Sequence, residues 1–225
     1  MNKYLFAIMI MYFILFLALK RSPNTLAAYQ KKLQKIDDHM GVGLSGLTAD
    51  GRSLVKYMRN ETLNHKYVFA TPMQGSRLVS DLADMHQRCT QSYVRRPYGV
   101  GLLVATYDQT GPHLFMTEPS GNFYEYVAMA IGSRSQTSRT YLEREFESFE
   151  NCSLDDLIKH GLKALAASLS GDVELDSKSA SIGIVGKDTT FKVLDDAAVQ
   201  PYLDSIEVEA DVEVSTEALV VDPDA

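Results

Sequence analysis

The sequence predicts an α+β fold in which helices cover sheets that are mainly antiparallel. Segments with strand and helix character follow one another in the order strands, two helices, strands, two helices, strands. Short links join consecutive strands, as hairpins allow and parallel crossovers do not. The order therefore favours helical layers on sheets over a doubly wound parallel sheet. With 225 residues and 45% apolar content, the chain fits one domain with its own core.

A hairpin and two helices are the first elements predicted after residue 30. Residues 33–36 and 40–45 flank residues 37–39, where two aspartates suit a tight turn. A helix follows, with Thr48 as its candidate cap, and a proline separates it from a second helix over residues 76–88. The apolar positions near helical spacing are Leu54, Val55, Met58 and Leu63 in the first helix, and Leu78, Val79, Leu82 and Met85 in the second.

Three strands are predicted in the middle of the chain, over residues 99–107, 113–117 and 123–131. Residues 108–112 and 119–121 separate them and contain the glycines and prolines typical of turns.

Two more helices and a hairpin follow. Ser133 is the candidate cap of a helix that runs to about Phe149, and Ser153 is the candidate cap of the next helix. Residues 181–186 and 189–194 read as a hairpin. The apolar stripe of the last helix consists of Leu154, Leu157, Ile158, Leu162, Leu165 and Leu169, and is interpreted as core.

Composition excludes several classes of function. The two cysteines, Cys89 and Cys152, cannot form a disulfide framework, which favours a reducing intracellular environment. None of the five histidines is spaced from another His or Cys as metal ligands are. Ten of the acidic residues lie in residues 193–225 without any Lys or Arg, and neither part of the chain has a basic stripe. We expect no metal, no cofactor and no nucleic-acid partner.

The N-terminal segment permits three interpretations. Residues 4–19 carry no charge and are flanked by basic residues, as in a signal peptide or a membrane anchor. As a helix, the segment spans about 24 Å, less than the roughly 30 Å of a hydrocarbon core. The third interpretation is a fully buried strand, which also reads as an unbroken apolar run. We favour the strand and expect no membrane partner.

Several separated motifs resemble one protein family. They are Arg-Pro-Tyr-Gly-Val-Gly-Leu-Leu at residues 96–103, Glu-Pro-Ser-Gly-Asn at 118–122, Ala-Ile-Gly-Ser-Arg-Ser-Gln at 130–136, and Ala-Ser-Ile-Gly-Ile-Val-Gly-Lys-Asp at 180–188. In this order they resemble the non-catalytic alpha subunits of the proteasome. The resemblance implies the four-layer αββα sandwich of N-terminal nucleophile hydrolases.

The resemblance also implies a function. Alpha subunits form the outer seven-membered rings of the 20S core, gate substrate entry and dock activators in ubiquitin-dependent protein degradation. The implied partners are other alpha subunits, the beta-ring subunits, and the regulatory particle or other activators. The implied location is the cytoplasm and nucleus. The alternative is a membrane-anchored or secreted hydrolase of the same fold, which only the N-terminal apolar segment favours.

No catalytic residue is predicted. An enzyme of this fold needs a Thr, Ser or Cys that becomes the first residue after cleavage, so that its own amino group serves as the base. Catalytic proteasome subunits release a threonine that follows a glycine at their first strand, and no Gly-Thr step occurs there in this chain. Thr189 and Thr190 lie in a late hairpin, where cleavage would destroy the domain. No GxSxG motif occurs.

One site residue follows from the resemblance. Lys32 occupies the position at which the family places the lysine of a pocket between neighbouring subunits. Its amine would pair with the C-terminal carboxylate of an activator tail. An ordinary solvated lysine beside a strand is the other interpretation.

We expect three segments along the chain. Residues 1–14 form an atypical apolar leader, residues 15–204 the proteasome alpha-type domain, and residues 205–225 a flexible acidic tail. The family's leading helix and gate segment have no counterpart in residues 1–14. We therefore expect this chain to enter rings less efficiently than a chain with the usual front end, and a competition experiment tests this.

Overall fold

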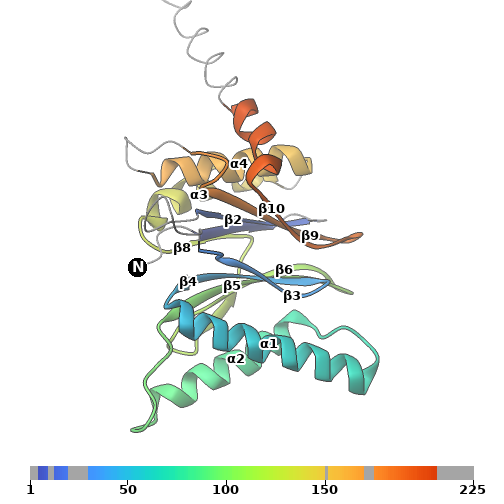
Figure 1. Ribbon diagram of the computed structural model, residues 1–225, viewed down its shortest axis with the longest axis vertical. Helices are drawn as coiled ribbons and strands as arrows, with labels where there is room; N and C mark the ends of the chain where they lie inside the picture. The colour runs from blue at the N-terminus through green and yellow to red at the C-terminus, as the bar shows by residue number, and fades with distance from the viewer. Residues whose placement is uncertain (1–4, 10–12, 20–29, 150–151, 170–174, 207–225) are drawn as a thin grey trace, which may run out of the picture.

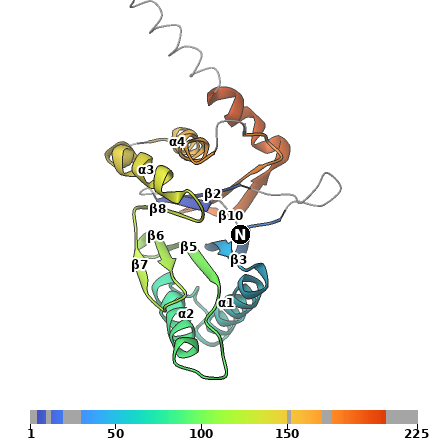
Figure 2. The same ribbon diagram turned by 90° about the vertical axis from the view of Figure 1, so that its left-hand side faces the viewer.

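The computed structural model describes residues 5–9, 13–19, 30–149, 152–169 and 175–206. Two sheets lie face to face in the centre, and a pair of helices covers the outer face of each sheet. Figures 1 and 2 show the same four layers from two directions. The predicted αββα sandwich is confirmed.

The first sheet contains the first and the last strand of the described chain and has the strand order β10-β9-β2-β1-β8. Each neighbouring pair is antiparallel. Its strands are β1 (Leu5–Met9), β2 (Phe13–Leu19), β8 (Ala128–Ile131), β9 (Ala180–Gly186) and β10 (Thr189–Asp195). The predicted hairpin over residues 181–194 is therefore confirmed.

The second sheet has the strand order β3-β4-β5-β6-β7 and is also antiparallel throughout. Its strands are β3 (Leu33–Asp37), β4 (Met40–Gly46), β5 (Val100–Asp108), β6 (Gly111–Thr117) and β7 (Phe123–Glu125). The predicted hairpin around residues 37–39 is confirmed, and β3 lies at the edge of the sheet.

Two helices cover each sheet. Helices α1 (Thr48–Phe69) and α2 (Gly75–Thr90) pack on the second sheet, and α3 (Ser135–Phe149) and α4 (Leu154–Ala167) pack on the first. A 3-10 turn, η1 (Asp196–Ala198), leads to a last helical segment at residues 200–206.

Alternation along β5 shows how the layers share the core. Leu102 and Val104 face α1 and α2, whereas Leu103 and Ala105 face the other sheet. All four side chains are completely buried. A strand between two apolar layers reads as a continuous apolar run, as residues 100–105 do.

The N-terminal apolar segment forms two strands, not one. Strands β1 and β2 pair with each other, while β1 also pairs with β8 and β2 with β9. Ile14, Leu17 and Ala18 are completely buried. The expectation of a buried strand was right in kind, but it missed the hairpin. The sheet includes residues before position 15, and the division of the chain at residues 14 and 204 stays a prediction.

A second correction concerns residues 123–131, which were predicted to form one strand. Strand β7 belongs to the second sheet and β8 to the first, so the chain passes from one sheet to the other between them. At this crossing, the Tyr126 amide donates a hydrogen bond to the Leu114 carbonyl at 2.9 Å.

Only one of the three predicted helix caps is confirmed. The Ser153 hydroxyl accepts a hydrogen bond from the Asp156 amide at 3.2 Å and caps α4. Thr48 is instead the first residue of α1, and its hydroxyl contacts the Gln30 side chain. Helix α3 begins at Ser135, two residues after Ser133. Among the described residues, no helix is both long and apolar enough to cross a membrane.

Candidate functional site

Lys32 directly precedes the edge strand β3 and is 4% exposed. Its carbonyl accepts a hydrogen bond from the Leu44 amide at 3.0 Å, which extends the pairing of β3 with β4 by one step. Alternation along β3 places Lys32 on the same side of the strand as Gln34, opposite Leu33 of the core between the sheets. Lys32 therefore lies on the side of the sheet that α1 covers.

The start of α1 lies close to this lysine. Gln30, two residues before Lys32, donates a hydrogen bond to the Thr48 hydroxyl. Leu47 precedes the helix and is 54% exposed. Gly46 has a φ of +140°, and a Cβ there would overlap the Gly99 carbonyl. Only glycine fits this turn without strain.

A buried carboxylate fixes the same turn from the other side. Asp50 accepts hydrogen bonds from Arg96 at 2.7 and 2.8 Å and from the Gly99 amide at 2.9 Å. These bonds, first those from Arg96 and then that from Gly99, hold the pKa of Asp50 below its ordinary value despite its burial. The Leu47 amide also donates to the Gly99 carbonyl at 2.8 Å. These hydrogen bonds from the loop before β5 thus fix the position of the start of α1.

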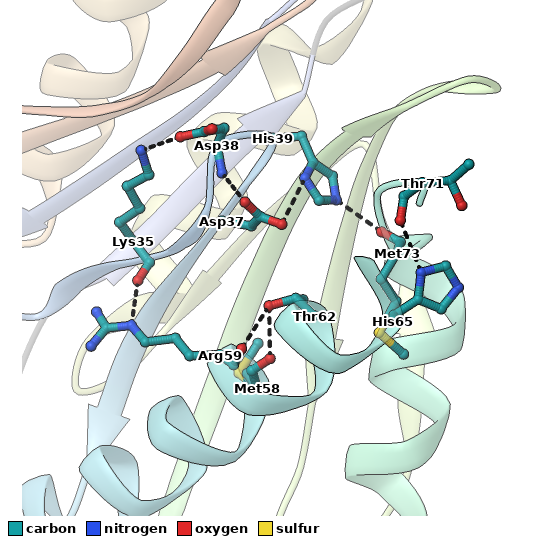
Figure 3. A network of polar contacts seen from close by, with 10 residues as sticks. All are labelled: Lys35, Asp37, Asp38, His39, Met58, Arg59, Thr62, His65, Thr71 and Met73. Carbon is teal, nitrogen blue, oxygen red and sulfur yellow. Dashed lines mark hydrogen bonds and ion pairs between the residues drawn. The ribbon is translucent and has the colours of Figure 1, made fainter. Parts of the chain in front are cut away.

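A polar network organises the opposite end of β3 (Figure 3). The Lys35 ammonium donates to Asp38 at 2.5 Å, and the Asp38 amide donates to Asp37 at 2.7 Å. The bond from Lys35 lowers the pKa of Asp38, which is exposed. His39 donates from Nε2 to the Met73 carbonyl at 2.8 Å. The turn is therefore tied to the segment that joins α1 to α2.

A cleft of about 320 Å³ lies between β3, β4 and α1. Its lining includes Gln34, Leu44, Arg52, Lys56, Arg59 and Asn60. Sequence reasoning missed the three cations among these residues. Their spacing of four and three positions on a predicted helix is the signal that could have revealed them, since such residues share one face.

A larger cleft of about 560 Å³ lies at the other end of the strands, between the turns and the link from α1 to α2. Its lining includes His39, His65, Gln74, Arg77, Asp108 and Lys187. The Nδ1 atom of His65 is 3.1 Å from the Thr71 carbonyl. The cleft mixes cations with a carboxylate.

The structure does not assemble a site from the threonines considered for catalysis. Thr189 and Thr190 lie in β10, as the predicted late hairpin requires. In the part of the chain that the structure describes, no group of three or more His, Cys, Asp or Glu side chains could hold a metal ion. The absence of catalytic and metal residues stays a prediction.

Known proteins are similar in sequence to this chain over most of its length. Residues 5–185 match the family described as proteasome subunit. Proteasome subunit alpha type-1 of Dictyostelium discoideum is 54% identical over 205 residues, covering 91% of this chain and 83% of that protein. The alpha type-1 subunit of Trypanosoma brucei rhodesiense is 45% identical, covering 85% and 73%. That of Caenorhabditis elegans is 41% identical, covering 84% and 73%.

These matches confirm the resemblance to alpha subunits, and within them to type-1. They also confirm that the four layers have the N-terminal nucleophile hydrolase arrangement. They do not favour a membrane-anchored or secreted hydrolase. The chain belongs to the proteasome subunit family.

Proposed function

We propose that this chain is a non-catalytic alpha-ring subunit of the 20S proteasome core. The observation that carries the proposal is 54% identity to an alpha type-1 subunit over 91% of the chain. The contribution of such a subunit is geometry: it helps to form the outer seven-membered ring that gates substrate entry in ubiquitin-dependent protein degradation. Threonine-type peptidase activity belongs to the complex and not to this chain.

The proposed partners are other alpha subunits beside it, beta-ring subunits beneath it, and the regulatory particle or other activators above it. The proposed location is the cytoplasm and nucleus. The second sheet and its helices support the proposal, because hydrogen bonds from Arg96 and Gly99 hold the start of α1 rigidly. A fixed position of this helix suits a ring in which each subunit must fit two neighbours.

The subunit role is tested by fractionating a lysate that expresses the full chain with a C-terminal tag, without detergent. Size-exclusion chromatography then separates the complexes, and each fraction is assayed for peptidase activity. We expect the tagged chain to co-elute with a very large, peptidase-active particle. Recovery only in the membrane pellet contradicts the role.

We further propose that Lys32 is the lysine of the pocket for activator tails. Its place directly before the edge strand β3 supports this, because another chain can approach a sheet at its edge. In particles that contain the chain, Lys32→Met should weaken stimulation by a tail peptide with a free C-terminus by roughly tenfold. Lys31→Met is the matched control and should leave stimulation unchanged. Equal stimulation of both variants contradicts the role of Lys32.

A further inference from the structure

Three cations line one face of α1 at the cleft beside β3. Arg52, Lys56 and Arg59 are four and three positions apart, so their side chains lie on the same side of the helix. All three residues are exposed. Gln34 and Asn60 add polar groups to the lining of the cleft.

The carboxylates of the described residues form no ion pair with this face. None of the ion pairs found among the described residues includes Arg52, Lys56 or Arg59. Asp50, on the preceding turn, is held by Arg96 and Gly99. Residues 20–36, which lead into β3, contain five Lys or Arg and no Asp or Glu. Like charges four residues apart destabilise a helix slightly, so Arg52 beside Lys56 does not stabilise α1.

Arg59 is held in a fixed position. Its Nε donates to the Lys35 carbonyl at 2.8 Å (Figure 3). Its Nη2 donates to the Gln34 side chain at 3.3 Å. A guanidinium has five N–H donors, and these bonds use two of them within the described chain. A side chain held in this way loses less freedom when a ligand binds.

The size of the cleft and the charge of the whole chain limit the class of ligand. A volume of about 320 Å³ accommodates a few side chains and not a nucleic-acid duplex. The net charge of −7 repels long polyanions. Along the helix axis, Arg52 and Lys56 are about 6 Å apart, at 1.5 Å per residue. Alternate side chains of an extended peptide are about 6.6 Å apart, which matches this spacing.

We propose that the cleft between α1 and β3 binds an acidic segment of a partner polypeptide, in extended form, with carboxylates at alternate positions. The carboxylates pair with Arg52, Lys56 and Arg59. Leu44 lines this cleft, and its amide also donates a hydrogen bond to the Lys32 carbonyl. The proposal nevertheless stands on the cleft alone and does not depend on the tail role of Lys32.

The test uses the purified full chain and a fluorescent peptide with Glu at alternate positions. Both ends of the peptide are blocked, so that Lys32 has no terminal carboxylate to bind. Fluorescence anisotropy measures the dissociation constant at two salt concentrations. The double variant Arg52→Gln, Lys56→Gln should bind about tenfold more weakly and with a smaller salt dependence. Arg59 is left in place because it joins α1 to β3.

The matched control is the double variant Arg88→Gln, Arg95→Gln, which makes the same change of net charge at exposed positions outside the cleft. It should bind the peptide as the original chain does. Equal weakening in both double variants would show a non-specific charge effect and overturn the proposal. A Gln version of the peptide that binds equally well overturns it too. A single-stranded oligonucleotide that binds more tightly, with the same dependence on Arg52 and Lys56, overturns the assignment to a polypeptide.

Discussion

His86 is a completely buried histidine on α2 with only one of its ring nitrogens hydrogen-bonded. Its Nδ1 donates to the Glu118 carbonyl at 3.0 Å, whereas Nε2 has no hydrogen-bond partner among the described residues. The ring packs against Tyr98 at 5.2 Å between centroids. Since a charged imidazolium is costly in such surroundings, burial lowers the pKa of His86, and the bond to Glu118 offsets this only in part.

The lowered pKa predicts a pH dependence of stability. Between the pKa of His86 in the folded chain and its ordinary value of 6.5, the unfolded chain binds more protons than the folded chain. The contribution of His86 to the free energy of unfolding is therefore complete above about pH 6.5 and decreases as the pH falls below it. His86→Gln should flatten this decrease, as measured by urea unfolding between pH 7.5 and 5.5. His65→Gln, at a partly exposed position, is the control and should keep the original slope. An unchanged slope in His86→Gln contradicts the prediction.

Elements with strong local signals could be predicted from the sequence, and those without could not. Paired aspartates marked the turn between β3 and β4, and Ser153 marked the start of α4. Residues 10–12, between β1 and β2 in the sequence, are Ile, Met and Tyr, none of which is a typical turn residue. The step from β7 to β8 likewise has no Gly, Pro, Asn or Asp. Each of these strand pairs was predicted as a single strand, because the sequence of an apolar run does not indicate where one strand ends and the next begins.

The candidate site was only partly predictable for a different reason. Lys32 was predicted from a resemblance of motifs and not from its chemistry, and its role stays a prediction. The cleft depends on α1 lying across β3 and β4, a tertiary contact that no local pattern encodes. The helix itself was predicted, so its row of cations could have been read from their spacing. The strands that these cations face could not be predicted from the sequence.

One close contact between a strand of the first sheet and a strand of the second sheet joins the two sheets. The ring of Phe191 on β10 lies against Gly41 on β4, so closely that a Cβ at Gly41 would overlap it. The Phe191 amide also donates to the Asp38 carbonyl at 2.7 Å. A strand of the first sheet is thus fastened to the first hairpin of the second sheet.

This contact predicts that Gly41→Ala lowers the free energy of unfolding by about 1 to 3 kcal/mol, because the Phe191 ring must move out of a packed core. Gly101→Ala on β5 is the matched control, since the nearest atom to a Cβ there is 3.7 Å away. It should be neutral or slightly stabilising, because alanine reduces the freedom of the unfolded chain. Urea unfolding of both variants measures the difference. Equal stability of the two variants would show that Phe191 does not pack over Gly41.

At the scale of the whole molecule, each sheet with its two helices forms one half. The apolar layer between the two sheets decides whether these halves unfold together. It consists of Ile14, Ala18, Leu33, Leu103, Ala105, Leu114, Ile131, Val185 and Phe191. Each helical pair has a separate core on its own sheet. Because the layer between the sheets excludes water from both sheets at once, neither half can open without exposing apolar surface of the other. We expect one cooperative transition.

The two free cysteines allow this to be measured. Cys89 on α2 is 4% exposed, and Cys152 directly precedes the cap of α4. Replacing Cys152 by Ser leaves Cys89 as the single thiol for labelling. In urea, labelling of Cys89 should follow the loss of far-ultraviolet circular dichroism, which reports all four helices. Leu103→Ala removes a completely buried side chain between the sheets and should shift both signals together, by about 2 to 5 kcal/mol. Full labelling of Cys89 while much of the helical signal remains would mean that the α1 and α2 half opens alone, and the layer between the sheets would then be too weak to couple the two halves.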